Sequence, residues 1–444
     1  MLIEKLLRSC PDMQEIFLLM RPKANMCIEE KLEQMLKNRL RSEQPHCLKK
    51  LIPLKGDIEI ERLGLSFADR NTLIEKVSII FHVAATVKFD DTLKKAVALV
   101  HVSTTYSQVD KPVIDEIVYP TEVDWKKTIQ IAETLDEYTF EVFKSKYIGT
   151  MPNSYIFTKR LAEQVIFDYS KSLPCVICRP SIITPTLNEP MKGWLDSFNG
   201  PVGLMVGCGK GIILVFYNDS FVNDNYVPID IVTKAMIVAG WKCGIINKND
   251  DTQNILPLVY NCSTTHETNP SRFVLFQIST KILANIPLEN MIWAPAMITT
   301  KNRFFYKILV LLLHVIPALF IDVLLQFAGK RPRLLKQQRK LFISSELATH
   351  FLLNKWVFQN KKLISLSNEV PRNNQRDFGF VTDLDYDKPL YYKNCIIGSK
   401  LFLLNESMDR LDAVKFHYRR MLWLDRIVKI LVGTLIMWII YDKY

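Results

Sequence analysis

The sequence contains little glycine, and the first glycine comes late. Only 15 of the 444 residues are glycine, and the first is Gly56. Residues 1–55 therefore contain no glycine-rich turn of the kind that cradles a phosphate. The chain also lacks an apolar run at its start, because Glu4, Lys5 and Arg8 interrupt "MLIEKLLRSCPD". This pattern excludes a secretory signal and predicts an amphipathic helix that begins without a capping residue.

Cysteine is present but is not arranged as a disulfide framework. The nine cysteines are scattered and odd in number, which favours free, mostly buried thiols in a reducing compartment. Cys175 and Cys178 form a CxxC pair within the apolar stretch "PCVICRP", which reads as a buried strand. Side chains three residues apart point to opposite faces of a strand, so we predict no redox or metal site there.

Composition and charge bound the class of protein. A chain of 444 residues favours two domains plus extra segments, and 48% hydrophobic residues provide a large core. The net charge of +11 is compatible with nucleic acid, anionic lipid headgroups or a substrate that carries phosphates. No recognised nucleic-acid module is present, so we expect no nucleic-acid partner.

Apolar runs and helical patterns alternate through the first half of the chain. Buried strands are predicted at 15–22, 77–85, 98–104 and 173–183, with helices between them. This order predicts an α/β fold with a Rossmann-like, doubly wound parallel sheet. Residues at about 110–150 are rich in acidic, basic and aromatic side chains and predict an inserted helical lid.

Two apolar segments bear on membranes. Residues 304–328 are strongly apolar but are interrupted by Lys307, His314, Pro317 and Asp322. An uninterrupted span needs about 20 apolar residues, so we expect a kinked, interfacial or buried helix pair. The basic run 329–340 then either rests on anionic headgroups or forms a solvated surface. Near the C-terminus, residues 430–441 form a continuous apolar stretch that reads as a marginal span or a one-leaflet anchor.

One tyrosine has a spacing that carries chemistry. Of the sixteen tyrosines, only Tyr155 has a lysine four residues on, Lys159. Positions i and i+4 share a helix face, and an ammonium beside a phenol lowers the pKa of the phenol from about 10. The pair predicts a proton donor near neutral pH; an ordinary aromatic–lysine neighbour pair is the alternative.

Hydroxyl groups follow a predicted strand in "HVSTTYS" (101–107). They would lie at the carboxyl edge of the sheet, where open parallel sheets bind ligands. Thr104 is the first candidate to hydrogen-bond a substrate carbonyl and Ser103 the second; turn formation is the alternative role of both.

Taken together, these segments resemble the extended short-chain dehydrogenase/reductases, and more closely the insect-type fatty acyl-CoA reductases of eukaryotes. The resemblance extends over almost the whole chain. The matching blocks, in order, include "GDIEIERLGLS", "FHVAATVKFDDTLKKAV", "VHVSTTYS", "NSYIFTKRLAEQ", "CRPSIITPTLNEPMKGWLDSFNGPVGLMVGCGKG", "VPIDIV", "YNCSTTHETNP", "FIDVLLQFAGKRPRL" and "WLDRIVKIL".

The resemblance implies a reaction and roles for four residues. A long-chain acyl-CoA would be reduced by two NADPH, through an aldehyde, to a primary alcohol. Tyr155 would donate the proton to the carbonyl oxygen. Lys159 would lower the pKa of Tyr155 and hold the nicotinamide ribose. Thr104, together with Ser103, would polarise the carbonyl.

The resemblance also implies a cofactor site. Asp57 and Ile58 would meet the adenine, and Ala84 and Ala85 would border the ribose and nicotinamide. Arg21 follows the first predicted strand, where a guanidinium suits the 2′-phosphate of NADPH. The remaining implied residues are Arg179 and Pro180, whose loop borders the site; packing is their alternative role.

The family further implies an organisation and a location. We expect a reductase domain over 1–270, a helical C-terminal domain over 271–425 and a membrane anchor over 426–444. The expected partners are a long-chain acyl-CoA and membrane lipid, and no particular protein partner is indicated. A membrane-associated protein with a cytosolic catalytic domain would lie on the endoplasmic reticulum or the peroxisome.

The sequence departs from the family in two places. Family members open with a strand and a "GxTGFLG" phosphate loop, whereas this sequence starts within the following helix. A further helix is missing between "LKKAVAL" and "VHVSTTY", so that thirteen residues, 86–98, serve as the only crossover. These departures predict a sheet without its first strand and weak binding of NADPH. The alternative function is a catalytically impaired, truncated paralogue or isoform that binds acyl chains, membranes or a partner.

Overall fold

The computed structural model describes residues 1–22, 26–37, 47–58, 60–83, 98–249, 256–264, 269–381 and 384–443. The chain forms two compact units, each assembled from separate segments. The first comprises Met1–Ser181, Ile229–Thr265 and Trp356–Asp385, and the second comprises Ile182–Pro228, His266–Lys355 and Tyr386–Tyr444. These units are not contiguous in sequence, unlike the ranges 1–270 and 271–425 that the sequence blocks predict.

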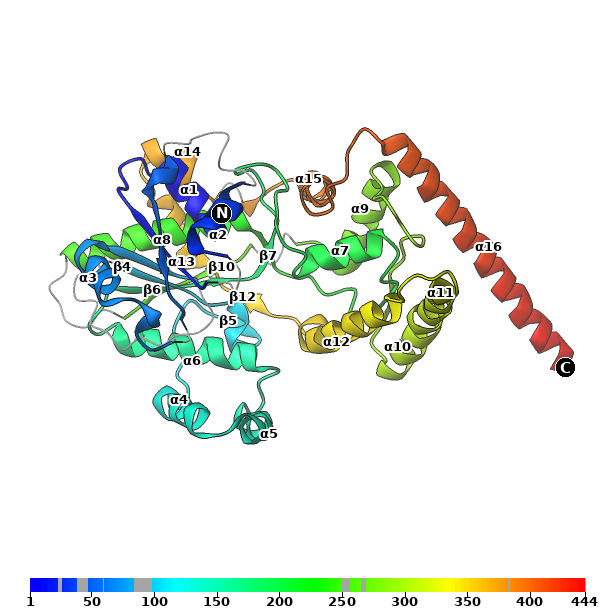
Figure 1. Ribbon diagram of the computed structural model, residues 1–444, viewed down its shortest axis with the longest axis horizontal. Coiled ribbons are helices and arrows are strands. Elements are labelled where there is room, and N and C mark those ends of the chain that lie inside the picture. The colour runs from blue at the N-terminus through cyan, green and yellow to red at the C-terminus, as the bar shows by residue number, and fades with distance from the viewer. Residues whose placement is uncertain are drawn as a thin grey trace. The chain divides into compact units, whose positions relative to one another are not determined.

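A four-stranded parallel sheet forms the centre of the first unit. Its strand order is β10–β6–β4–β3, with β3 at Ile79–His82, β4 at Ala98–Val102, β6 at Cys175–Pro180 and β10 at Leu258–Cys262. Every residue of β4 and β6 is buried, as their continuous apolar runs predict. Helix α6 (Ser154–Tyr169) covers one face of the sheet and α8 (Ile229–Asn249) covers the other (Figure 1). The predicted Rossmann-like α/β fold is therefore confirmed.

A separate two-stranded parallel sheet carries the first part of the chain. It pairs β1 (Ile16–Met20) with β2 (Leu51–Lys55), and its core includes Leu7 and Leu32. Within the described ranges, no strand joins this sheet to the four-stranded one. The short crossover predicted over 86–98 lies, apart from residue 98, outside the described residues.

The remaining elements of the first unit frame its sheet. Two of them, β5 and β12, pair although they are far apart in sequence, with Val113 opposite Val357. Helices α4 and α5 form the insertion predicted at about 110–150. The bounds are α1 Leu2–Ser9, α2 Ile28–Lys37, α3 Phe67–Lys76, β5 Val113–Ile114, α4 Trp125–Thr134, α5 Glu137–Tyr147, β12 Val357–Phe358, α13 Lys361–Asn368 and α14 Gln375–Phe378.

The second unit is mostly helical, as predicted for the C-terminal region. Its two small parallel sheets pair β7 with β9 and β8 with β11. The bounds are β7 Ile182–Thr184, α7 Pro201–Gly209, β8 Val215–Tyr217, β9 Tyr226–Pro228, α9 Arg272–Asn285, β11 Ile298–Thr300, α10 Arg303–Val310, α11 Ile316–Phe327, α12 Leu334–Leu353, α15 Lys388–Gly398 and α16 Leu411–Lys443. A π-helical turn, Leu311–Val315 (here called the π-turn), links α10 to α11.

Among the described residues, one helix is long and apolar enough to cross a membrane. It is Arg303–Phe327, which combines α10, the π-turn and α11. Helix α16 contains the predicted anchor, and its apolar positions Ile430, Leu431 and Trp438 are exposed.

Candidate active site

Helix α6 carries the tyrosine and the lysine singled out in the sequence. Asn153 caps the helix, because its side-chain oxygen accepts a hydrogen bond from the Ile156 amide at 3.0 Å. With Asn153 as its cap, α6 begins at Ser154, and Tyr155 and Lys159 stand one helical turn apart, as predicted.

Lys159 is buried at the carboxyl end of β4. Its Nζ donates a hydrogen bond to the Val102 carbonyl oxygen at 2.8 Å. Burial lowers the pKa of the Lys159 ammonium below its usual value, and the nearby Glu163 carboxylate partly opposes that shift. The lysine is therefore held at the edge of the sheet where the sequence predicts a ligand.

Tyr155 does not have the lowered pKa that the sequence predicts. Its side chain is 51% exposed, and partial burial raises the pKa of the phenol above its usual value. The physical reason is that the Lys159 ammonium donates to the Val102 carbonyl oxygen, while burial of the phenol disfavours its charged form. The predicted lowering is wrong for this arrangement, whereas the site roles of the two residues stay predictions.

The two predicted hydroxyls differ in how firmly each is engaged. Ser103 donates to Glu163 at 2.5 Å, so its hydrogen is committed to a carboxylate. Thr104 donates to the Pro180 carbonyl oxygen at the longer distance of 3.3 Å and also accepts from the Tyr106 amide. Thr104 therefore performs the turn role considered as its alternative, whereas Ser103 bonds to a distant segment, α6. Because its donor bond is the weaker one, Thr104 is the more available of the two to a substrate.

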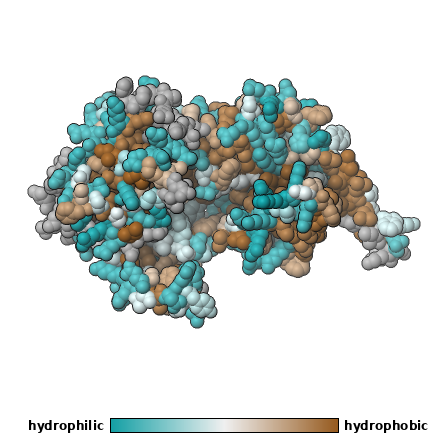
Figure 2. Space-filling view, in the orientation of Figure 1, coloured by the Kyte–Doolittle hydropathy of each residue, from teal (hydrophilic) through white to brown (hydrophobic). Residues whose placement is uncertain are grey.

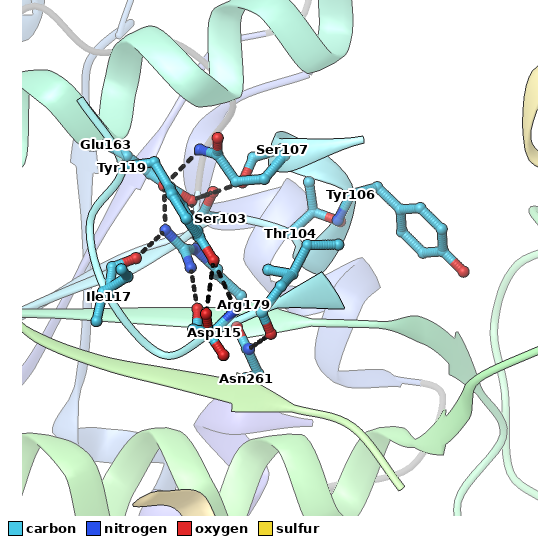
Figure 3. Close-up of polar contacts among 12 residues, drawn as sticks. Ser103, Thr104, Tyr106, Ser107, Asp115, Ile117, Tyr119, Glu163, Arg179 and Asn261 are labelled. Atoms are coloured by element: carbon cyan, nitrogen blue, oxygen red, sulfur yellow. Dashed lines mark hydrogen bonds and ion pairs between the residues drawn. The ribbon is translucent and has the colours of Figure 1, made fainter. Parts of the chain in front are cut away.

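A buried ion pair links α6 to the sheet. Arg179, fully buried at 0% exposure, donates from Nε and Nη2 to the two carboxylate oxygens of Glu163 at 2.9 and 2.6 Å (Figure 3). The same carboxylate accepts from Ser103, Ser107 and Gln108. Five donor bonds to one carboxylate satisfy its acceptor capacity and fix α6 relative to β4 and β6.

The other arm of Arg179 holds the segment after β5. Its guanidinium donates to the carbonyl oxygens of Asp115 and Ile117, and it lies over the Tyr119 ring at 5.8 Å. In Figure 3 these groups converge on the guanidinium, while the Tyr106 ring points away from it. The packing role considered for Arg179 is thus present.

The role of Glu163 was not predicted from the sequence, although a signal was available. Glu163 follows Lys159 by four residues, so the pattern Tyr-x3-Lys-x3-Glu places all three on one helix face. An acidic residue on a buried helix face requires a partner, and Arg179, the last residue but one of β6, supplies it.

A second cluster lies at the carboxyl ends of β1 and β2. The Arg21 guanidinium pairs with the Asp57 carboxylate at 2.6 Å, and Lys31 donates to the Arg21 carbonyl oxygen. The structure therefore brings together two of the residues predicted to hold the adenosine end of a cofactor. Ile58, beside them, is half-buried. Ala84 and Ala85 lie outside the described residues.

These two clusters fit a phosphorylated nicotinamide dinucleotide in part. Arg21 keeps 52% of its side chain exposed, and a guanidinium suits a phosphate. The ammonium of Lys159 and the hydroxyl of Thr104 provide donors near the carboxyl end of β4. At the end of β2, Gly56 packs tightly, since an added Cβ would meet Leu19 at 2.3 Å. That glycine serves packing rather than a phosphate cradle.

Comparison with solved structures defines the fold. A reductase domain of a non-ribosomal peptide synthetase from Mycobacterium tuberculosis matches with a TM-score of 0.55 and 14% identity, covering 91% of this chain and 89% of that one. The terminal reductase domain of the myxalamid pathway matches with a TM-score of 0.53 and 14% identity, covering 90% and 86%. The likeness extends over nearly the full length of all three chains, so it includes the parts outside the sheet.

Comparison by sequence defines the family. A family model described as male sterility protein, of the NAD-binding type, matches residues 1–99 and 91–236, and a second model of that description matches residues 313–406. The two segments of the first match meet where the sequence analysis finds two blocks fused. The family model and the fold together define a Rossmann-type reductase that uses a nicotinamide cofactor.

Relatives of known name narrow this class. Fatty acyl-CoA reductase 1 of Xenopus laevis is 34% identical over an alignment of 448 positions, which covers 95% of this chain and 85% of the relative. The human protein of that name gives the same identity and coverage. The chain belongs to the fatty acyl-CoA reductase family.

Proposed function

We propose that this protein is an alcohol-forming fatty acyl-CoA reductase that uses NADPH to reduce a long-chain acyl-CoA. The observation that carries the proposal is the convergence of family positions at the carboxyl ends of β4 and β6. There Lys159 donates to Val102 and Thr104 donates to Pro180. Ligands bind at this edge in open α/β sheets.

The reaction would proceed in two reductions. In the first, acyl-CoA, NADPH and a proton give an aldehyde, free CoA and NADP⁺. In the second, the aldehyde, NADPH and a proton give a primary alcohol and NADP⁺. A bound nicotinamide supplies the hydride to the carbonyl carbon. Tyr155 gives its phenolic proton to the carbonyl oxygen, and Thr104 orients that oxygen by donating a hydrogen bond.

Activation of Tyr155 requires a change at Lys159. In the described arrangement the ammonium donates to Val102, and the pKa of the phenol is raised. With a dinucleotide bound, the Lys159 ammonium would hold a ribose hydroxyl, and a movement of the ammonium away from the Val102 carbonyl oxygen would bring its charge toward the phenol. The positive charge would then favour the phenolate and lower the pKa of Tyr155.

We further propose a membrane setting for the reaction. Long acyl chains and fatty alcohols partition into lipid, and α16 ends in exposed apolar residues. The segment 426–444 is the proposed anchor, and the catalytic unit would face the cytosol from the endoplasmic reticulum or the peroxisome.

The decisive test is alcohol formation from labelled palmitoyl-CoA by the purified full chain. We expect Tyr155→Phe to abolish alcohol formation, because the proton donor is lost while the ring is kept. General acid catalysis contributes on the order of 10²–10⁴ in rate. The matched control is Tyr217→Phe, which removes a phenol in the second unit. No alcohol from the unaltered chain would instead favour an impaired paralogue that only binds acyl chains or membranes.

Cofactor choice has its own test at Arg21. We expect Arg21→Ala to weaken binding of NADPH far more than binding of NADH. The guanidinium would contact the 2′-phosphate, and NADH has no such group. A hydrogen bond to a charged group contributes about 1.5–3 kcal/mol, or roughly 10- to 100-fold in affinity. Fluorescence titration of both cofactors measures the ratio. Equal losses of affinity for NADPH and NADH would contradict the role of Arg21 in binding the 2′-phosphate. If the unaltered chain does not bind NADPH, the weak binding expected from the sequence is confirmed.

A further inference from the structure

One face of the apolar helix Arg303–Phe327 is bound to its own protein. The side chains at every fourth position are buried, namely Tyr306, Val310, His314, Ala318 and Asp322. In a regular α-helix a four-residue spacing drifts around the axis. A π-turn rotates less per residue, so the one at Leu311–Val315 counters the drift and keeps this stripe on one side.

The polar groups on this buried stripe have partners in the second unit. The His314 Nε2 accepts a hydrogen bond from the Leu214 amide at 2.9 Å. The Asp322 carboxylate accepts from the amides of Arg333, Leu334 and Leu335 at 2.9–3.0 Å and so caps α12. These residues interrupt the apolar run because they belong to the inner face.

The outer face of the same helix is apolar and exposed. Its exposed apolar residues are Phe304, Phe305, Ile308, Leu311, Leu312, Ile316, Leu319, Phe320, Ile321, Val323, Leu324 and Phe327. In Figure 2 brown side chains gather over the part of the second unit that Figure 1 labels α10 and α11. A contiguous apolar surface of this kind marks an interaction site.

The charge around this face identifies the occupant. Residues 301–345 contain nine basic residues and one acidic residue, Asp322, which is engaged at α12. The basic residues are Lys301, Arg303, Lys307, Lys330, Arg331, Arg333, Lys336, Arg339 and Lys340. Two of them pair with acidic residues of the second unit, Lys301 with Asp219 and Arg303 with Glu346, and the remaining seven provide the excess of positive charge. An apolar face bordered by cations matches a bilayer with anionic headgroups, whereas a second copy of this chain would bring the same positive charge.

We propose that Arg303–Phe327 lies in the membrane–water interface as a monotopic contact surface, with its outer face among acyl chains and its basic flanks on anionic headgroups. At 25 residues the helix is long enough to span. A span would need lipid on all sides, whereas the inner face packs on its own unit and its polar groups bond there. Both ends of the helix therefore lie on one side of the bilayer. This inference does not depend on catalysis, since its readouts do not measure activity.

Photo-crosslinking tests the contact in the full chain. The protein is bound to vesicles of phosphatidylcholine and phosphatidylserine that contain a phospholipid with a diazirine in its acyl chain. We expect crosslinks on the outer residues of 304–327, mapped separately from those on α16. Crosslinks between two copies of the chain, or crosslinks confined to α16, would overturn the proposal.

Amine labelling tests the topology on the unaltered chain. In sealed vesicles, a membrane-impermeant reagent should label Lys301 and Lys330 from the outside, at both ends of the helix. If one of these two lysines were labelled only after the vesicles are permeabilised, the helix would span the bilayer and the proposal of a monotopic contact would be wrong.

A variant pair checks the chemistry of the face. Phe320→Glu with Leu324→Glu should reduce lipid crosslinking on this helix by at least about tenfold, because charge is costly among acyl chains. The control is Phe67→Glu, at a phenylalanine of the first unit that is 76% exposed, compared with 64% for Phe320. Equal crosslinking in both variants would contradict the assignment, and the labelling experiment stands if the double variant does not fold.

Discussion

Lys159 keeps an ammonium inside the protein under two opposing influences. Burial lowers its pKa, and the Glu163 carboxylate one turn further along α6 raises it. Burial is the larger effect, so the net pKa is lowered. Since the proposed chemistry needs the charged form, Glu163 acts as a positioning residue that helps Lys159 to keep its proton.

The proximity of Glu163 to Lys159 predicts a shift in the pH profile of the activity. An activity that requires the Lys159 ammonium is lost as pH rises through its pKa. Glu163→Gln removes the carboxylate that raises this pKa, so we expect the alkaline limb of kcat to move to lower pH. A pH series of steady-state rates measures the limb.

Two controls separate charge from packing. Glu163→Gln leaves the Arg179 guanidinium buried without its partner, which costs about 3–5 kcal/mol. The double variant Glu163→Gln with Arg179→Gln removes both charges. It should fold stably and still show the alkaline limb of kcat at lower pH. Ser103→Ala removes one bond to Glu163 but no charge. A shift of equal size in Ser103→Ala would show that the effect is structural.

Part of the candidate site could be predicted from residue types and their spacing. The Tyr155–Lys159 spacing placed both on α6, because a helix period follows from sequence alone. The direction of the Tyr155 pKa did not follow. It depends on which acceptor the Lys159 ammonium meets, and that acceptor is the Val102 carbonyl of a separate strand. Contacts between distant segments are invisible to local spacing.

At the scale of elements, Glu116 ties three segments of the first unit together. Its carboxylate accepts from the amides of Asn261 in β10 and of Lys362 and Leu363 in α13. Burial is the largest cause acting on this group and raises the pKa of Glu116 above 4.5. The folded state therefore holds a proton more tightly than the unfolded state.

The sign of this shift predicts a pH-dependent stability. A raised pKa contributes stability that is present below the unfolded value near 4.5 and is lost as pH rises through the folded value. Glu116→Gln stays uncharged, so the melting temperature of the native protein should fall relative to this variant as pH rises above 4.5. Thermal unfolding from acid to neutral pH measures the difference, and Glu137→Gln on the exposed face of α5 is the control. If the difference in melting temperature between the native protein and Glu116→Gln did not change with pH, ionisation of Glu116 would not be its cause.

The same scale shows what the sequence could and could not predict. Continuous apolar runs identified the strands β4 and β6, since burial on both faces leaves a plain signal. The pairing of β5 with β12 was missed. Two residues per strand give no periodicity, and the partners lie more than two hundred residues apart in the chain.

At the scale of the whole molecule, part of the net charge of +11 can be assigned to one surface. Part of the excess is the exposed basic run that opens α12, beside the apolar face of α10 and α11. The sequence alone left open whether this run is a solvated surface or a lipid contact. Salt dependence distinguishes the two, because attraction to a charged bilayer is screened.

We expect Lys336→Gln, Arg339→Gln and Lys340→Gln together to weaken binding to vesicles that contain phosphatidylserine. Each basic residue near an anionic surface contributes about 1 kcal/mol, which for three is roughly a hundredfold. Flotation at low salt measures the loss, and neutral vesicles should show little change. The control is Lys126→Gln with Lys127→Gln on α4. An undiminished affinity would identify the run as solvated.

The Arg179–Glu163 pair also constrains how this protein can diverge. Losing either charge alone strands the other in the interior, whereas replacing both by apolar side chains of similar volume is often neutral or favourable. Mutational drift at these two positions must therefore pass through a costly single mutant, and homologues should exchange them jointly. The outward residues of α11 face no such barrier, so among apolar types they should vary independently.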